Sequence, residues 1–224
     1  LKSITNTSPS SIELDPGRRQ FLLMSMNLGI VGVTSVLGGI GLFQARRKAT
    51  IITQNIAIPN LPAEFQGLKI AQVSDLHVGP TIKADYARTV VDQVNSLQPD
   101  IIFFTGDMVD GSVDRLSADV EPLRDLKSKY GTYFVTGNHE YYSGAKQWVD
   151  KVGELGMIHL KNEHRILTRG ESSLAIVGVT DLMAHHTIKS HKSDPHKAMS
   201  GVPEDIPSIM LAHQPGTADM IQNL

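Results

Sequence analysis

Cysteine is absent from the 224 residues of this chain. Disulfide bonds are therefore excluded, and so is any metal site built from thiolate ligands. The absence of cysteine leaves the redox compartment of the protein open. Internal repeats and low-complexity segments do not stand out either. The length fits one domain of ordinary size together with an appendage.

A large excess of charge of one sign is missing as well, because the formal net charge is only −2. Six of the 21 basic residues lie before residue 51, whereas only Glu13 and Asp15 of the 23 acidic residues do. The rest of the chain is therefore acidic, and nucleic-acid phosphates attract basic surfaces. We expect no nucleic acid as the main partner, and the composition leaves the oligomeric state open.

Charged residues are also missing from one long run, which extends from Phe21 to Phe43. A membrane span needs about 20 apolar residues, and glycine, which is frequent in this run, is common in transmembrane helices. Basic residues bracket the run as interfacial anchors, with Arg18-Arg19 before it and Arg46-Arg47-Lys48 after it. We predict a transmembrane anchor with basic flanks over residues 18–48.

This anchor would contact the membrane through residues 21–43 and follow a flexible tail or loop at residues 1–17. The alternatives are a buried helix of a soluble protein and a cleaved signal peptide. Arg18-Arg19-Gln20-Phe21-Leu22 resembles a twin-arginine export signal. The run is nevertheless longer than the roughly 7–15 residues of a signal core, and no Ala-x-Ala site follows it. An uncleaved anchor is therefore favoured.

Four short polar motifs follow four apolar runs in the remainder of the chain. They are Asp75-Leu76-His77, Gly106-Asp107-Met108-Val109-Asp110, Gly137-Asn138-His139-Glu140 and His213. The first two motifs, and then the second and third, are separated by about the length of one strand–helix–strand unit, roughly 30 residues. The spacing predicts that all four motifs lie at the C-terminal edge of one sheet, where ligands bind in open α/β folds.

The residue types in these motifs suit metal-dependent hydrolysis of a phosphate ester. Such a reaction needs charge neutralised on the phosphoryl oxygens and a nucleophile near neutral pH, and two metal ions about 3.5–4 Å apart supply both. Carboxylate, imidazole and amide-oxygen ligands suit Mn, Fe or Zn. We expect two divalent metal ions, with Asp107 as the candidate bridge because a carboxylate has two oxygens.

In order and spacing the motifs resemble the D-x-H, G-D-x-x-D, G-N-H-[DE] and later His of calcineurin-like metallophosphoesterases, over roughly residues 51–224. The resemblance implies a phosphoesterase that cleaves phosphomonoesters or phosphodiesters with a hydroxide bridging two metals. It implies that Asp75 and His77 bind the first metal and that Asp107 bridges both. Asn138 and His213 would bind the second metal. His139 would be catalytic, contacting the substrate phosphate and protonating the leaving group.

The same resemblance implies the fold class, an α/β sandwich of mostly parallel or mixed sheets flanked by helices and preceded by one transmembrane helix. Bacterial membrane-bound members of the family are similar and imply a bacterial cytoplasmic membrane, with the catalytic domain outside the cytoplasm. The count of basic residues around the span leans weakly the other way. An anchored site favours a lipid-linked or cell-envelope phosphate ester as substrate.

One motif of the family, Gly-His-x-His, is not reached before Leu224. We therefore expect the metallophosphoesterase domain, residues 51–224, to be truncated at its C-terminal end, with one His ligand missing from each metal. Such a fragment would bind at most one metal tightly and hydrolyse little. The alternative function is a non-catalytic membrane-anchored binding or scaffold protein derived from a phosphoesterase.

Hydrophobic patterning predicts further elements of an α/β fold. The expected helices cover residues 83–97, 116–126 and 145–155, and the expected strands cover residues 51–58 and 174–179. A last apolar run, residues 205–213, leads into the fourth motif. The alternation of strands and helices predicts a mostly parallel sheet with helices outside.

Several other polar residues could support the site. Asp110 could orient a metal ligand, as carboxylates behind metal-bound histidines do, or cap a turn. Glu140 could orient His139 or His77. Tyr141 and Tyr142 could line a substrate pocket or pack in the core. The remaining candidates are His185, His186, His191 and His196, as extra metal ligands or an exposed loop, Asp181 at a strand end, and His159 and His164, which we expect at the surface.

Overall fold

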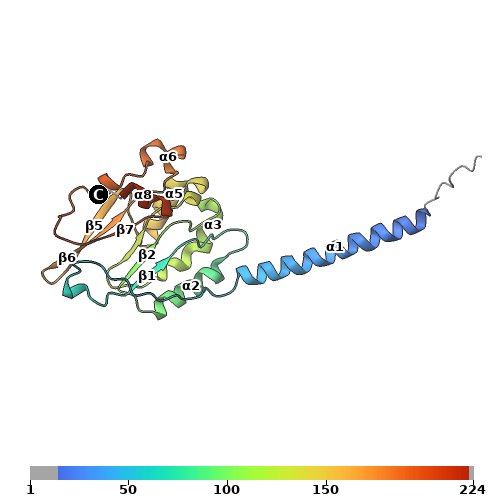
Figure 1. Ribbon diagram of the computed structural model, residues 1–224, viewed down its shortest axis with the longest axis horizontal. Coiled ribbons are helices and arrows are strands. Elements are labelled where there is room, and N and C mark those ends of the chain that lie inside the picture. Colours follow the sequence, from blue (N-terminus) through green and yellow to red (C-terminus); the bar gives the residue numbers. More distant parts are fainter. Residues whose placement is uncertain (1–14, 222–224) are drawn as a thin grey trace, which may run out of the picture. The chain divides into compact units, whose positions relative to one another are not determined.

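The computed structural model describes residues 15–221 of the chain. Most of the predicted tail, residues 1–14, lies outside the described residues, as do residues 222–224. The chain divides into two compact units, residues 1–47 and residues 48–224 (Figure 1). Each unit is described by itself below.

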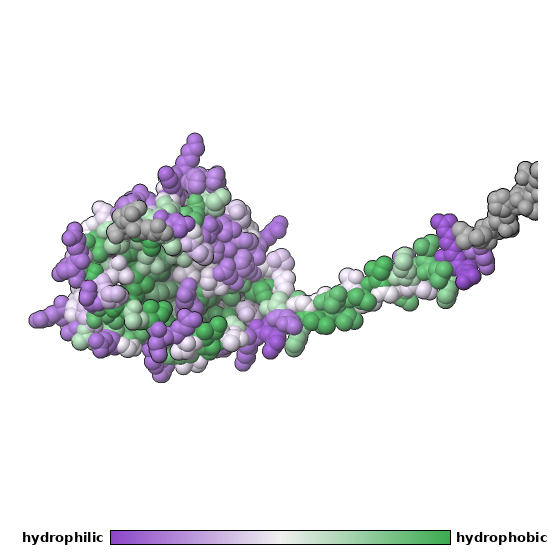
Figure 2. Space-filling view, in the orientation of Figure 1, coloured by the Kyte–Doolittle hydropathy of each residue, from purple (hydrophilic) through white to green (hydrophobic). Residues whose placement is uncertain are grey.

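The described part of the first unit is formed mainly by helix α1, Pro16–Ala45, which contains the long uncharged run. Asp15 caps the helix by accepting a hydrogen bond from the Gly17 N–H at 2.9 Å, and Pro16 fits the first turn because no donor is needed there. At 1.5 Å per residue the helix is about 45 Å long, which exceeds a hydrocarbon core of about 30 Å. Its described side chains are all exposed, and Figure 2 shows a hydrophobic surface between hydrophilic ends. Helix α1 is therefore a candidate membrane span.

The second unit is built on a four-stranded parallel sheet in the order β1-β2-β3-β4. Its strands are β1 (Ile70–Val73), β2 (Ile101–Phe104), β3 (Thr132–Phe134) and β4 (Ile158–His159). Helices α2 (Ala84–Ser96), α3 (Val113–Val120) and α5 (Ala145–Glu154) connect successive strands. This arrangement confirms the predicted α/β class.

A second sheet packs against the first and completes the sandwich. It contains β5 (Glu163–Arg169), β6 (Ser172–Gly178) and β7 (Ser208–Leu211), with β5 antiparallel and β7 parallel to β6. Sequence patterning did not indicate β5. The prediction of a single sheet edge is wrong, because the strand that leads to His213 belongs to this second, mixed sheet.

Strand β2 shows how the two layers share one core. All four of its residues are buried, and successive side chains point to opposite faces of the sheet. Ile102 and Phe104 join the cluster formed with helices α2, α3 and α5. Ile101 and Phe103 join the cluster that includes Leu174 of the second sheet. A strand covered on both faces reads as an uninterrupted apolar run, which is what this segment shows.

Short helical segments fill the connections. They are η1 (Ala63–Phe65), η2 (Glu121–Asp125), α4 (Asn138–Ser143), α6 (Ala184–Thr187), η3 (Lys189–His191), α7 (Pro195–Met199), η4 (Pro215–Thr217) and α8 (Ala218–Ile221). The predicted helix at 116–126 is interrupted, because α3 ends at Val120 and the 3₁₀ turn η2 begins at Glu121, with Pro122 in its first turn. Proline lacks the N–H that would continue the α-helical ladder.

The predicted helices at 83–97 and 145–155 are confirmed by α2 and α5, and the strand at 174–179 is confirmed by β6. The predicted strand at 51–58 is wrong for the part of the chain described here, residues 15–221. That segment joins neither sheet, and its Ile52 and Ile56 side chains are each 78% exposed. Apolar β-branched residues therefore indicated a strand where the described residues supply no partner for pairing.

Candidate metal centre

The loops after β1 and β2 run side by side beyond the sheet and carry the first two motifs. The Asp75 N–H donates to the Gly106 carbonyl at 3.1 Å, and the His77 N–H donates to the Asp107 carbonyl at 3.1 Å. An isolated parallel bridge between Val78 and Val109 extends the pairing further. The backbone ladder therefore fixes the first motif directly beside the second.

Three residues of these loops adopt left-handed backbone conformations. The φ angles are 56° for Asp75, 50° for His77 and 54° for Asp107. This region costs an L-residue roughly 1–2 kcal/mol, although Asp visits it more readily than most residues. Non-glycine residues held there often mark functional sites. The three residues in this conformation are among those whose ligand atoms gather at the centre.

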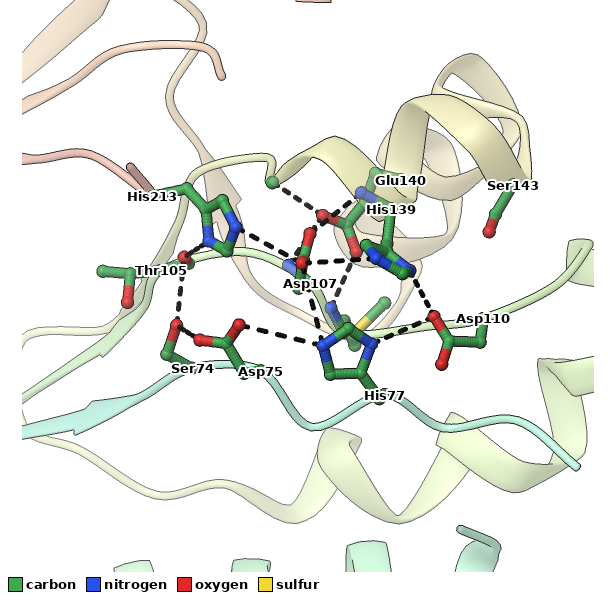
Figure 3. A network of polar contacts seen from close by, with 12 residues as sticks. Ser74, Asp75, His77, Thr105, Asp107, Asp110, His139, Glu140, Ser143 and His213 are labelled. Carbon is green, nitrogen blue, oxygen red and sulfur yellow. Dashed lines mark hydrogen bonds and ion pairs between the residues drawn. The ribbon is translucent and has the colours of Figure 1, made fainter. Parts of the chain in front are cut away.

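Asp107 occupies the centre of the group and is only 4% exposed. Its Oδ2 lies 3.3 Å from His213 Nε2, 3.7 Å from His77 Nε2 and 3.9 Å from His139 Nε2 (Figure 3). Its Oδ1 accepts a hydrogen bond from the His139 N–H at 2.9 Å. One carboxylate thus faces three imidazole nitrogens from three different segments of the chain.

The potential ligand atoms form two overlapping groups, and each group lies within 4.8 Å. One group is His77, Asp107 and His139, and the other is Asp75, Asp107 and His213. Asp75 also approaches His77, with 3.8 Å between Oδ1 and Nε2. Mixed carboxylate and imidazole donors at this spacing suit a divalent transition metal. The residues fit the predicted centre, since Asp107 belongs to both groups.

The backbone near Asp107 leaves no room for additional side-chain atoms. A Cβ on Gly137 would lie 2.1 Å from Asp107 Oδ1, and a Cβ on Gly106 would lie 2.4 Å from the Gly137 nitrogen. Gly106 also has a φ of 89°, which glycine adopts at little cost. The glycines of the second and third motifs therefore allow the two loops to approach each other at the centre.

Asp110 holds two of the imidazoles in position. Its Oδ1 lies 3.0 Å from His77 Nδ1 and also contacts His139 Nδ1. The two rings meet edge to face, with centroids 4.5 Å apart. With Nδ1 held by a carboxylate, each ring directs Nε2 toward Asp107. This is the arrangement expected of a carboxylate that orients metal-binding histidines.

Glu140 does not orient the rings of His139 or His77, which corrects the expectation drawn from the sequence. Its fully buried carboxylate accepts hydrogen bonds from the N–H groups of Asp107 at 2.9 Å, Met108 at 2.7 Å and Gly137 at 2.7 Å. Burial raises the pKa of Glu140 to about 7, although these donors oppose the shift. Glu140 therefore joins the backbones of the second and third motifs.

His213 reaches the centre from the second sheet. It follows β7, and its Nδ1 lies 2.8 Å from the Thr105 carbonyl at the end of β2. The contact with Asp107 raises the pKa of His213 to about 9. Burial alone would raise the pKa of Asp107, but the contacts with His213 and His139 lower it. The raised pKa means that His213 holds its proton more strongly than a free histidine does when no cation is bound, so a metal ion would compete with that proton.

The pKa of His77 is also set by burial acting against nearby carboxylates, and the carboxylates prevail. Burial alone would lower its pKa, whereas the hydrogen bond with Asp110 and the charges of Asp110, Asp107 and Asp75 raise it. Asn138, the remaining predicted ligand, begins α4 next to His139. Its role stays a prediction.

The histidine-rich stretch gathers no second centre among residues 15–221, because the ligand groups described there contain none of its histidines. His185 and His186 stack on each other with ring centroids 4.1 Å apart. His191 Nδ1 lies 3.0 Å from the Tyr141 hydroxyl oxygen. Asp181 is 1% exposed, and its Oδ1 accepts a hydrogen bond from the Met183 N–H at 2.8 Å.

The expectation that His159 and His164 lie at the surface is wrong. Both are half-buried. Burial lowers the pKa of His159 to about 4, and the charge of Lys161 adds to the shift. His164 Nδ1 lies 2.9 Å from the Ala198 carbonyl. Neither histidine belongs to the ligand groups around Asp107.

One support of the centre was missed in the sequence. The Ser143 hydroxyl accepts a hydrogen bond from the Gly111 N–H at 3.1 Å, and Trp148 Nε1–H donates to the Gly111 carbonyl at 2.9 Å. Both contacts fix the backbone of Gly111, the residue that follows Asp110 in the chain. Trp148 is the only tryptophan of the sequence, and its indole N–H could have been expected to need a hydrogen-bond acceptor. The acceptor is the backbone carbonyl of Gly111, which no pattern of side chains indicates.

An α/β sandwich with carboxylates and histidines gathered at its strand ends is an arrangement suited to binding divalent metal ions. The sequence model of the calcineurin-like phosphoesterase family matches residues 68–220, and the chain belongs to this family. The matched family is one of phosphoesterases, hydrolases that act on phosphate ester bonds.

Similar curated proteins include a transmembrane protein with metallophosphoesterase domain from Danio rerio, 35% identical over 191 residues. That match covers 83% of this chain and 44% of the relative. An uncharacterized metallophosphoesterase from Helicobacter pylori is 31% identical over 210 residues, covering 93% of this chain and 54% of the relative. The chain thus spans about half the length of these relatives.

Among solved structures, a phosphopantetheinyl hydrolase from Mycobacterium tuberculosis aligns with a TM-score of 0.44 and 14% identity. The alignment covers 70% of this chain and 71% of that structure.

Proposed function

We propose that the full-length protein hydrolyses phosphomonoesters or phosphodiesters at a centre of two divalent metal ions, which are Mn, Fe or Zn. The observation that supports this proposal most strongly is the position of Asp107. Its carboxylate belongs to both ligand groups and faces the Nε2 atoms of three histidines. A shared carboxylate is what a pair of neighbouring cations requires.

In this proposal Asp75 and His77 bind one ion, Asn138 and His213 bind the other, and Asp107 binds both. The 3.8 Å separation of Asp75 Oδ1 from His77 Nε2 supports the first pairing, and the 3.3 Å separation of Asp107 Oδ2 from His213 Nε2 supports His213 as a ligand beside Asp107. By distance, the ligand atoms instead group Asp75 with His213 and His77 with His139. When bound, the two ions would supply a hydroxide near neutral pH and neutralise charge on the phosphoryl oxygens.

His139 is the proposed catalytic residue outside the set of metal ligands. It would contact the substrate phosphate and donate a proton to the leaving-group oxygen. Asp110 supports this role because it contacts His139 Nδ1 and leaves Nε2 toward the centre. A positioned general acid typically contributes 10²–10⁴-fold to a rate. Asp110 and Glu140 act through position, since one orients rings and the other fixes loops.

Helix α1 bears on where the protein is located and therefore on which substrates it meets. We propose that α1 anchors the protein in the cytoplasmic membrane of a bacterium, with the catalytic unit outside the cytoplasm. The candidate span, and the similarity to a Danio rerio relative described as a transmembrane protein, support an anchor. An anchored centre favours phosphate esters that are linked to lipids or belong to the cell envelope.

The test is hydrolysis of nitrophenyl phosphate monoester and diester by the full-length protein in detergent with Mn²⁺. We expect turnover that a chelator abolishes and that Asp107→Asn reduces by at least about 100-fold, since an amide offers one neutral oxygen in place of the two charged oxygens shared between the ions. Asp92→Asn, at an exposed carboxylate of α2, is the matched control and should retain activity. Equal rates with and without chelator would contradict the proposal. Metal binding without any turnover would favour a non-catalytic binding or scaffold protein.

A further inference from the structure

An exposed aromatic ring stands at the edge of the candidate metal centre. Tyr142 is 70% exposed, and its ring meets the His139 ring at 63° with centroids 5.5 Å apart. The two residues lie three positions apart in α4, so they share one face of the helix. The ring of Tyr142 thus extends the surface that His139 presents at the centre.

Helix α4 holds this ring in place at both ends. At its start, Glu140 accepts hydrogen bonds from the backbones of Asp107, Met108 and Gly137. At its end, the Ser143 hydroxyl accepts a hydrogen bond from the Gly111 N–H at 3.1 Å. The position of the Tyr142 backbone is therefore set by the same contacts that shape the centre.

The neighbouring tyrosine shows that Tyr142 cannot turn inward. Tyr141 is only 5% exposed, packs with Ala145 and Ala184, and places its hydroxyl oxygen 3.0 Å from His191 Nδ1. Rotating α4 to bury Tyr142 would expose Tyr141 and break these contacts. An exposed aromatic ring leaves a large apolar area in water, where a partner ring could cover it.

We propose that Tyr142 binds the leaving group of the ester by packing against a flat ring of that group. The inference rests on the proposed function, because it places the substrate at the metal centre. His139 is the proposed proton donor to the leaving-group oxygen, so the leaving group must pass close to the His139 ring. Tyr142 is the aromatic side chain in contact with that ring on the exposed side. The substrate class is therefore a phosphate ester whose ester oxygen carries a ring.

The test compares the binding of two non-hydrolysable ligands, phenylphosphonate and methylphosphonate, to the Mn²⁺-loaded full-length protein by calorimetry. We expect Tyr142→Ala to weaken the affinity for phenylphosphonate by about ten-fold, which is the size of one aromatic stacking contact. The affinity for methylphosphonate should change by less than about two-fold. Tyr142→Phe keeps the ring and should bind both ligands like the wild type. Ile166→Ala, at a 42% exposed position in β5, is the matched control.

The outcomes separate this inference from the proposed function. Methylphosphonate binding that depends on Mn²⁺ reports the metal centre alone. Suppose that both phosphonates bind the wild type. If Tyr142→Ala then leaves the affinity for phenylphosphonate unchanged, or lowers the affinity for both ligands equally, the ring-packing inference is overturned while the proposed metal centre is unaffected. If Tyr142→Phe lost as much affinity for phenylphosphonate as Tyr142→Ala, the contact would belong to the Tyr142 hydroxyl and not to the ring. That result would also overturn the inference. If neither phosphonate binds the wild type, the proposed function itself fails and the inference fails with it.

Discussion

Asp107 Oδ2 lies 3.3 Å from His213 Nε2, although the two residues follow strands of different sheets. Asp107 follows β2 at the centre of the first sheet, and His213 follows β7 in the second sheet. The second imidazole nitrogen of His213 contacts the carbonyl of Thr105, which links it to the end of β2. The candidate centre therefore forms only when both layers of the sandwich have assembled.

Asp110→Asn tests whether one carboxylate positions two histidines. An amide at residue 110 keeps the size of the side chain but removes the charge shared by His77 Nδ1 and His139 Nδ1. We expect metal affinity or kcat to fall by about 10–100-fold, the usual effect of removing the partner of a metal-binding histidine. Metal content and steady-state kinetics measure the change. Unchanged values for both would show that Asp110 only caps a turn.

Glu140→Gln tests the hydrogen bonds by which Glu140 connects the backbones of the second and third motifs. The amide has one acceptor oxygen and an NH₂ group, so it cannot accept all three backbone N–H groups. We expect the free energy of unfolding to fall by about 2–4 kcal/mol, because at least one buried donor loses a charged acceptor. Denaturant unfolding of the protein in detergent measures this loss. Glu154→Gln, at an exposed position of α5, is the control and should change stability little.

Gly137→Ala tests the close approach of the loops. The added Cβ would lie 2.1 Å from Asp107 Oδ1, so Asp107 must move. We expect loss of metal binding and of hydrolysis. Gly153→Ala, in helix α5, meets nothing within 4 Å and should stabilise the protein by up to about 1 kcal/mol. Normal metal content in Gly137→Ala would contradict the tight contact.

His159 gives stability a dependence on pH. Its pKa is lowered from 6.5 to about 4 because the half-buried ring disfavours the charged form. Between these values the unfolded chain binds more protons, so the free energy of unfolding falls as pH falls from about 6.5 to 4. This group contributes up to about 3 kcal/mol of that loss.

His159→Leu should flatten the decline, and denaturant unfolding at several pH values measures it. The change costs little hydrogen bonding, since the buried Nε2 has no partner among the described residues. His196→Leu, at an exposed histidine, should leave the decline as in the wild type. Identical pH profiles for wild type and His159→Leu would show that His159 is not buried in its neutral form.

The sequence predicted the strands and helices of the first sheet, and the gathering of the motif residues beyond it, because that information is local. Each motif directly follows an apolar run, and the helices at 83–97 and 145–155 show a clear periodicity. The placement of His213 on a second sheet was not predictable, because strand spacing does not say which sheet a strand joins. The three backbone hydrogen bonds of Glu140 were missed for a related reason, since their partners carry no side-chain signal.

The prediction for residues 51–58 failed for a different physical reason. Strand formation depends on a partner for backbone pairing as well as on β-branched residues. The described part of the chain gives this segment no such partner. The Gly170 turn between β5 and β6 was equally unrecognised, although its φ of 61° suits glycine.

Electron paramagnetic resonance of the Mn²⁺-loaded full-length protein tests the central claim most directly. Two Mn²⁺ ions held by a shared Asp107 carboxylate would lie about 3.5–4 Å apart, close enough for magnetic coupling. The account predicts a coupled two-ion spectrum in the wild type that Asp107→Asn converts to signals of isolated ions. Isolated-ion signals in the wild type at every Mn²⁺ concentration would contradict the account.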